Sequence, residues 1–249
     1  PVPHGVSPVC ETAFQGLCLD RDAAQSARES GGYEMQKTKT WTLLLLIVLG
    51  FWAKAHPAKA AENVLTVAGG CFWCVESDFE GVSGVLEVVS GYTGGASKNP
   101  SYKQVSAGGS GHYEAVQIRF NPSKISKEEL LRLFFRSVDP TDAGGQFCDR
   151  GDSYRTAIFV SDSAEKQLAE KAKSEAEAAL RKRVVTPVLM AGTFWKAEDY
   201  HQDYYKGSKV VITRFGPVKQ STAYKKYREA CGRDQRVKAL WGKEAVFAH

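Results

Sequence analysis

The residues best suited to chemistry lie in one short stretch, Leu65–Glu76, which reads L-T-V-A-G-G-C-F-W-C-V-E. Its first, β-branched part predicts a buried strand, and the glycine pair that follows predicts a tight turn. No helix breaker follows until Gly81, so a helix should begin near Cys71. Unpaired N–H groups and the helix dipole should lower the pKa of its thiol, and the thiolate is the reactive form. The stretch therefore predicts a nucleophilic Cys71 beside an apolar wall of Phe72 and Trp73.

Two other interpretations of the same stretch remain open. Cys71 could be a small buried hydrophobic residue, with the two neighbouring rings in an ordinary core. The spacing of Cys71 and Cys74 also fits a thioredoxin-like redox pair or half of a metal site. The rest of the chain has to choose among these interpretations.

The composition is that of an ordinary globular protein. The 249 residues are 43% hydrophobic and 24% charged, and the net charge is +5 without a dominant lysine–arginine block in the part expected to fold. Nucleic-acid binding therefore gains little support. The cysteines are too few and too scattered for a disulfide scaffold. They are Cys10, Cys18, Cys71, Cys74, Cys148 and Cys231.

The N-terminal part carries a targeting signal. A short basic segment begins at Met35, an apolar run of twelve residues spans 41–52, and small residues follow up to Ala60. This layout predicts a secretory signal peptide from Met35 to Ala60 and export to the periplasm or the extracellular space. An uncleaved membrane anchor is the alternative. Residues 1–34 show no periodic pattern and precede a plausible initiator, so we expect them to be upstream sequence rather than part of the native protein.

The remaining chain predicts strands and helices in alternation. Strands are expected at 64–68, 85–92, 113–120, 154–160 and 184–189. The last strand should lie at a sheet edge, because it contains Pro187. Helices are expected after Cys71, after the capping box at Ser126 and over 164–183, and a shorter one over 198–205. Residues 96–111 and 139–153 should be long loops. This order predicts an α/β (α+β) two-layer sandwich in one catalytic domain over 61–219. The polar, loosely patterned residues 220–249 predict an irregular C-terminal tail.

A series of segments resembles the A-type peptide methionine sulfoxide reductases. The matching segments are G-C-F-W at 70–73 with Glu76, G-Y-T-G-G at 91–95, N-P-S-Y at 99–102, G-H-Y-E-A-V at 111–116, D-P-T at 139–141, Y-R-T-A-I-F at 154–159 and A-E-D-Y-H-Q at 197–202. Together they extend over most of the chain after the signal segment. The resemblance implies a ferredoxin-like core and reduction of the S-epimer of methionine sulfoxide, free or in proteins. It also implies a thioredoxin-type reductant, with no metal and no organic cofactor.

The resemblance assigns the reacting groups. Cys71 would attack the sulfoxide sulfur, and Glu114 would give a proton to the sulfoxide oxygen. Tyr102 and Tyr154 would hold that oxygen through their hydroxyl groups. Without the resemblance, a solvated surface group would be the first interpretation of Glu114, and the two tyrosines could equally be core rings. For Glu114 to donate at neutral pH, an apolar pocket must raise its pKa.

Further residues around this centre are assigned in the same way. Phe72 and Trp73 match the rings that receive the S-methyl group, and Asp149 matches a family aspartate near the site. His201 is expected to form structural hydrogen bonds beside the site, with a role as a base as the alternative.

Completing the cycle requires a second thiol. Attack on the sulfoxide leaves a sulfenic acid on Cys71, which another thiol converts to a disulfide. Cys231 fits the family habit of a mobile C-terminal resolving cysteine and is our first choice. Cys74 and Cys148 remain alternatives or relay thiols. Cys74 lies three residues after Cys71, a spacing at which a disulfide can form, and Cys148 lies next to Asp149. Because export separates the protein from cytosolic thioredoxin, we expect a thioredoxin-like domain outside the cytoplasm as the partner.

Two rival functions remain to be distinguished. The C-F-W-C motif resembles the active-site motif of a general thiol–disulfide oxidoreductase. That function, however, leaves Tyr102, Glu114 and Tyr154 without a role. A secreted zinc- or haem-binding module would need a second C-x-x-C pair, or a histidine directly after Cys74, and the sequence has neither.

Overall fold

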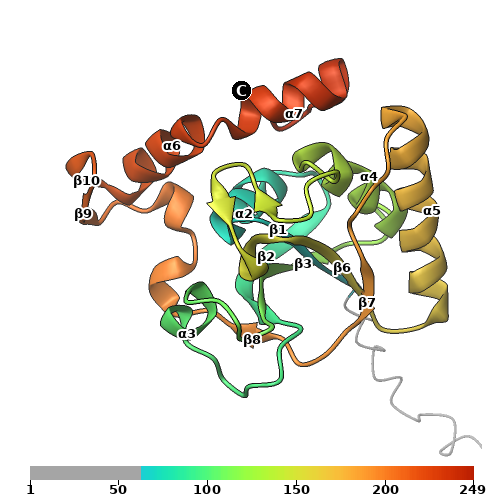
Figure 1. Cartoon of the computed structure of the whole chain (residues 1–249), viewed down its shortest axis with the longest axis horizontal. Helices are drawn as coiled ribbons and strands as arrows, with labels where there is room; N and C mark the ends of the chain where they lie inside the picture. The colour runs from blue at the N-terminus through green and yellow to red at the C-terminus, as the bar shows by residue number, and fades with distance from the viewer. Residues whose placement is uncertain (1–62) are drawn as a thin grey trace, which may run out of the picture. The chain divides into compact units, whose positions relative to one another are not determined.

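A six-stranded mixed sheet forms the centre of the structure (Figure 1), with the strand order β7-β6-β1-β3-β2-β8. The computed structural model describes residues 63–249, so the predictions for residues 1–34 and for the signal peptide from Met35 to Ala60 lie outside the described residues. The strands of the sheet are β1 (Asn63–Gly69), β2 (Val85–Thr93), β3 (Tyr113–Phe120), β6 (Thr156–Val160), β7 (Val188–Met190) and β8 (Trp195–Lys196). Neighbouring strands are antiparallel except for β6 and β7, which are parallel.

Three helices cover one face of this sheet. They are α2 (Phe72–Glu80), α4 (Lys127–Ser137) and α5 (Ser163–Leu180), which contact β2 and β3, β1, and β6, respectively. Val67 and Ile158 point toward the helices, where they join a core that includes Phe134 and Phe135. The opposite face carries a smaller cluster that includes Ala68 and Tyr113. The α+β sandwich predicted from the sequence is therefore confirmed.

The alternation of β3 decides where Glu114 points. Successive side chains of a strand face opposite sides of its sheet. Val116 and Ile118 lie in the core beneath the helices, and Glu114 shares their parity. The strand thus carries its carboxyl group inward, toward the start of α2, and the side chain is only 1% exposed.

Two regions that the sequence predicts to be loops contain short ordered elements. Residues 96–111 include α3 (Tyr102–Ser106), which begins at a capping box formed by Ser101 and Gln104. Residues 139–153 contain a small hairpin, β4 (Gly145–Gln146) with β5 (Asp149–Arg150), and most of the 3₁₀ helix η1 (Asp152–Tyr154). Two further 3₁₀ helices, η2 (Asp199–His201) and η3 (Tyr204–Lys206), occupy the segment predicted to be a short helix. No helix in the described part of the chain is long and apolar enough to cross a membrane.

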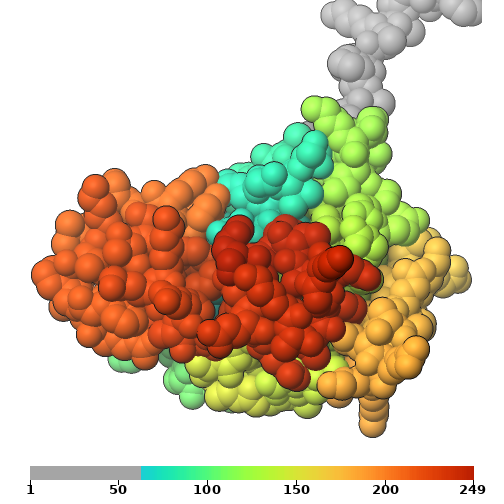
Figure 2. Space-filling model, turned by 90° about the horizontal axis from the view of Figure 1, so that it is seen from above, coloured from blue at the N-terminus to red at the C-terminus, as the bar shows by residue number. Residues whose placement is uncertain are grey.

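The prediction of an irregular C-terminal tail is wrong. After a hairpin of β9 (Val210–Thr213) and β10 (Gly216–Lys219), the chain forms α6 (Gln220–Ala230), α7 (Arg233–Trp241) and the short η4 (Gly242–Glu244). Figure 2 shows this C-terminal segment, coloured orange-red to red, lying over the face that is seen from above. Val237 and Trp241 join the main core, and the indole N–H of Trp241 donates to the carbonyl of Val138 at 3.3 Å.

Buried ion pairs explain why this segment looks too polar to fold. Arg228 and Arg233 are 9% and 2% exposed, and both contact Asp78 of α2. The guanidinium of Arg228 donates to Asp78 at 2.7 Å, and that of Arg233 also donates to the carbonyl of Ser137 at 2.8 Å. Charged residues are buried here because each finds a partner on another element, which a local sequence pattern does not reveal.

Removing the shared carboxylate should therefore unfold the C-terminal helices first. We expect Asp78→Ala to lower the free energy of unfolding by about 3–5 kcal/mol, because it leaves the buried Arg233 without its counter-charge and Arg228 with Asp234 alone. Urea titration followed by circular dichroism measures this loss. The control is Glu175→Ala, which breaks the exposed pair with Lys171 on α5 and should cost at most about 0.5 kcal/mol. A similar small loss in both variants would contradict the structural role of Asp78.

Candidate active site

The turn between β1 and α2 places Cys71 at the helix start. Cys71 is the N-cap of α2, and its carbonyl accepts from the N–H of Cys74 at 3.0 Å. Gly70 precedes it with φ +83°, and a Cβ at this position would lie 2.6 Å from the Cβ of Gln146. Only glycine fits such a backbone conformation at such a close approach. The strand–turn–helix arrangement predicted for this stretch is therefore present.

A cavity of about 400 Å³ opens beside Cys71. All of the residues predicted for the site line it, although they come from the start of α2, α3, β3, the loop after β4, β5, η1 and the end of α6. They are Cys71, Phe72, Trp73, Cys74, Tyr102, Glu114, Cys148, Asp149, Tyr154 and Cys231. The structure thus brings these residues together, and the role of each remains a prediction.

The two thiols of the C-F-W-C motif form a hydrogen-bonded pair. The hydrogen bond to Cys74, burial and the carboxyl groups of Glu114 and Asp149 raise the pKa of Cys71. The same hydrogen bond, with the charges of Arg233 and Arg228, lowers the pKa of Cys74 to about 7. The expected lowering of the Cys71 pKa by the helix start is therefore wrong for the free protein. The pair loses its first proton near neutral pH, and the charge rests on Cys74.

Glu114 meets the start of α2 directly. The backbone N–H of Phe72, one of the unpaired donors of the first helical turn, donates to its Oε2 at 3.1 Å. Burial nevertheless dominates and raises the pKa of Glu114 to about 8, as the sequence interpretation required. At pH 7 this side chain is a neutral carboxylic acid that can donate a proton into the cavity.

Two tyrosines complete the polar part of the cavity. Burial first, and then the nearby Glu114, raise the pKa of Tyr102 to about 12, and the same causes raise the pKa of Tyr154. Both hydroxyl groups are therefore protonated donors at neutral pH. Glu198 holds α3 in place, because its carboxylate accepts from the N–H of Tyr102 and from the hydroxyl of Tyr92, each at 2.9 Å.

The apolar wall is larger than the sequence interpretation proposed. Phe72 and Trp73 form its core, and the ring of Tyr204 stacks on Trp73 with a centroid separation of 3.8 Å and an interplanar angle of 4°. The sequence places Tyr204 only in an aromatic, polar helix and gives no sign that it lies against the motif. His201 packs between Phe72 and Tyr102, with centroid separations of 5.0 and 4.5 Å.

The ring of His201 packs without forming the hydrogen bonds expected of it. Neither ring nitrogen has a hydrogen-bond partner among the described residues, and burial lowers the pKa of His201 to about 4. The ring is neutral at pH 7 and contributes through its contacts with the aromatic wall.

Glu76 is a further residue that positions this wall. Its buried carboxyl group accepts from the hydroxyl of Ser90 at 2.7 Å and from the N–H of Asp203 at 2.7 Å. Asp203 directly precedes Tyr204, so Glu76 ties the stacked ring to α2 and to β2. Burial raises the pKa of Glu76 to about 7.

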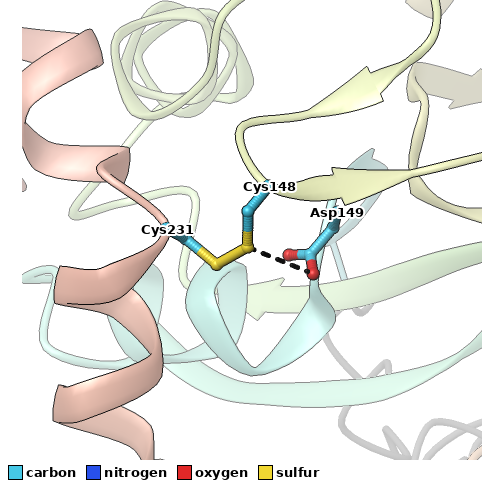
Figure 3. A group of neighbouring side chains, drawn as sticks. All are labelled: Cys148, Asp149 and Cys231. Atoms are coloured by element: carbon cyan, nitrogen blue, oxygen red, sulfur yellow. Dashed lines mark hydrogen bonds between the residues drawn. A yellow bond between two sulfur atoms is a disulfide. The ribbon is translucent and has the colours of Figure 1, made fainter.

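A disulfide at the rim joins Cys148 to Cys231 (Figure 3), with a Cα–Cα distance of 4.8 Å. Asp149 lies beside it, with Oδ1 3.8 Å from the sulfur of Cys148. Cys71 and Cys74 are free. Cys231 is not on a mobile tail, because it caps α6 and its N–H donates to the carbonyl of Tyr227 at 2.9 Å.

Two clusters among the described residues have the spacing of metal ligands. One consists of Cys148, Asp149 and Cys231, and the other of Glu76, Glu80 and Asp203. In the first cluster the two sulfur atoms are bonded to each other. In the second, Ser90, Tyr205 and Lys206 already contact the carboxylates. The sulfur atoms of the first cluster and the carboxylates of the second are therefore engaged within the protein.

Comparison with known proteins gives consistent matches. The family described as peptide methionine sulfoxide reductase matches residues 63–244. A relative from Caulobacter vibrioides, peptide methionine sulfoxide reductase MsrA 2, is 48% identical over 198 residues, which cover 79% of this chain and 94% of the relative. A protein of the same name from Rhizobium meliloti is 46% identical over 206 residues, which cover 81% of this chain and 97% of that protein. The crystal structure of Mxr1 from Saccharomyces cerevisiae in reduced form matches with a TM-score of 0.56 and 30% identity, covering 58% of this chain and 84% of that one.

Proposed function

The chain belongs to the peptide methionine sulfoxide reductase family, and from this premise we propose that its cavity reduces the S-epimer of methionine sulfoxide, free or in proteins. One observation carries the proposal. A cysteine at a helix start, a carboxyl group with a raised pKa and two protonated tyrosines line one cavity whose wall is aromatic. This combination supplies a nucleophile, a proton donor and hydrogen bonds to a developing oxyanion.

The first step breaks the sulfur–oxygen bond of the substrate. Proton transfer along the shared hydrogen bond to Cys74 leaves the thiolate on Cys71, which attacks the sulfoxide sulfur. Glu114 protonates the oxygen, and Tyr102 and Tyr154 donate hydrogen bonds to it. The oxygen moves to the Cys71 sulfur, so a thiol and a sulfoxide become a sulfenic acid and a thioether. Phe72, Trp73 and Tyr204 would enclose the S-methyl group.

The next steps restore Cys71. The thiol of Cys231 attacks the sulfenic acid and releases water, which gives a Cys71–Cys231 disulfide. The thiol of Cys148 then attacks the Cys231 sulfur of this disulfide, which releases Cys71 as a thiol and forms the Cys148–Cys231 bond. The pairing of Cys148 with Cys231 at the cavity rim supports this order.

A thioredoxin-type dithiol is the proposed reductant. Cys148 is exposed, Cys71 and Cys231 are half-buried and Cys74 is buried, so the relay carries oxidising equivalents outward to the surface. An external dithiol reduces the Cys148–Cys231 bond and is itself oxidised to a disulfide. This scheme needs no metal and no organic cofactor.

The activity should depend on Glu114 and on pH. We expect turnover that requires added methionine sulfoxide, with kcat/KM rising through about pH 7, where the thiol pair loses its first proton, and falling above about pH 8, where Glu114 loses its own. Glu114→Gln should lower kcat about 10²- to 10⁴-fold and remove the falling limb. The control Glu128→Gln, on the exposed side of α4, should keep wild-type turnover. Unchanged sulfoxide reduction by the Glu114 variant would refute its role.

The relay predicts which disulfides can be trapped. Reduced enzyme given one equivalent of methionine sulfoxide should yield the Cys148–Cys231 linkage, as read by mass spectrometry of a non-reduced digest. Cys148→Ser should stop at Cys71–Cys231, and the control Cys74→Ser should still yield the wild-type product. A Cys71–Cys74 linkage in the Cys148 variant would show instead that Cys74 resolves the sulfenic acid.

We also propose that the protein is exported and processed. The support is the layout of the segment from Met35 to Ala60, with its basic start, apolar run and small residues before Ala61. Expression of the whole chain should then give a product outside the cytoplasm whose first residue is Ala61, which N-terminal sequencing reads directly. An exported product beginning before Ala61 would exclude this cleavage site.

A further inference from the structure

Strand β9 forms one side of the cavity mouth. Figure 1 shows the β9–β10 hairpin beyond the central sheet and beside α6. The consecutive residues 211–214 line the cavity, and none of the residues of β10 does. Successive side chains of a strand point to opposite faces, so a consecutive run that lines one cavity presents the edge of the strand rather than one face. The edge of β9 that faces away from β10 therefore borders the cavity.

The backbone of this edge is unpaired. Ile212 lies opposite Pro217, and Val210 lies opposite Lys219. The pair beyond Val210 and Lys219 is formed by Lys209 and Gln220. This pair is hydrogen-bonded, because the N–H of Gln220 donates to the carbonyl of Lys209 at 2.9 Å.

Hydrogen-bonded and non-hydrogen-bonded pairs alternate along an antiparallel ladder, and Pro217 has no N–H to give. The N–H and C=O groups of Val210 and Ile212 therefore point away from β10. No group among residues 63–249 forms a hydrogen bond with the main chain of Ile212 along this edge.

The side chains on this strand are unusual for a free edge. Ile212 is 84% exposed and Val210 is 66% exposed, and both are apolar and β-branched. Exposed edges of this composition invite pairing with another chain, and proteins normally protect them with charge, proline or a covering element. Here Pro217 protects the outer edge of β10, while the edge of β9 beside the cavity is left open.

We propose that the free edge of β9 binds the main chain of the substrate, an extended segment of an oxidised protein, as an added β-strand. The inference rests on the proposed function and states how that site recognises a peptide. The methionine sulfoxide side chain would enter the cavity, while the flanking residues lie on the rim and exchange hydrogen bonds with Ile212 and Val210. The continuity of the edge with the cavity that holds Cys71 selects a substrate peptide over other occupants.

The pairing predicts an alternating pattern in the substrate. An added strand uses every second N–H group, so single N-methylation along an acetylated hexapeptide with a central methionine sulfoxide should lower kcat/KM at alternate positions only. Each sensitive position should lose about two- to tenfold, the equivalent of one hydrogen bond. Losses at every position, or at none, would overturn the proposal.

A variant of the edge tests the protein side. Ile212→Pro removes an N–H that points away from β10, so the hairpin keeps its own hydrogen bonds. The ratio of kcat/KM for the hexapeptide to that for free methionine sulfoxide should fall about two- to tenfold. The matched control Ile212→Thr keeps the N–H and the β-branch and should keep the wild-type ratio.

The remaining outcomes separate this inference from the proposed function. Failure of the wild-type enzyme to reduce either substrate would refute the proposed function. Reduction of both substrates with an unchanged ratio in Ile212→Pro would refute the role of the β9 edge alone. A wild-type dimer that Ile212→Pro dissociates, seen by analytical ultracentrifugation, would identify a second copy of the chain as the occupant and would also refute it.

Discussion

Helix α2 is buried on nearly every side, and the structure depends on how its polar groups are satisfied there. At its start, the N–H of Phe72 meets Glu114 on β3. In its middle, Glu76 accepts hydrogen bonds from β2 and from the segment before η3. Farther along, Asp78 faces Arg228 and Arg233 of the C-terminal helices. A buried helix with unmatched polar groups would be unstable, so each contact is also a constraint on where its partner element lies.

These constraints produce the chemistry of the cavity. The elements that surround α2 remove water from the start of the helix, and burial raises the pKa of Glu114 even though it accepts a helix N–H. The thiols of Cys71 and Cys74 sit in the same dry space, where one hydrogen bond and two arginines decide which sulfur carries the charge. One packing arrangement thus keeps Glu114 protonated at neutral pH and places the charge of the thiol pair on Cys74.

The C-terminal helices link this interior to the surface. Arg228 and Arg233 flank Cys231 in the sequence and bind Asp78 beneath the cavity, so the cysteine is held at the rim by charges that are themselves buried. The hairpin before α6 also borders the cavity, through residues 211–214. One segment of the chain, from β9 to α7, therefore contains both the proposed exit for oxidising equivalents and the surface proposed for the substrate main chain.

Local sequence determined the elements whose signals lie within a few residues. The glycine pair before Cys71, the alternation of β3 and the capping residue at Ser126 predict β1, α2, β3 and α4 close to their observed bounds, because turns, periodicity and caps are local. The motifs also indicated the residues of the cavity, since their resemblance to a family carries information about contacts that no single segment contains. The fold class followed from the order of these elements.

Tertiary structure alone decided the rest. Residues 220–249 look polar, yet they form two helices because Arg228 and Arg233 find Asp78 about 150 residues earlier in the chain. Tyr204 stacks on Trp73, and Glu76, on another element, binds the backbone of the preceding residue. The pKa order of Cys71 and Cys74 and the pairing of Cys148 with Cys231 likewise depend on neighbours from distant elements. Burial and electrostatics act through space, so a one-dimensional pattern contains the groups but not the distances between them.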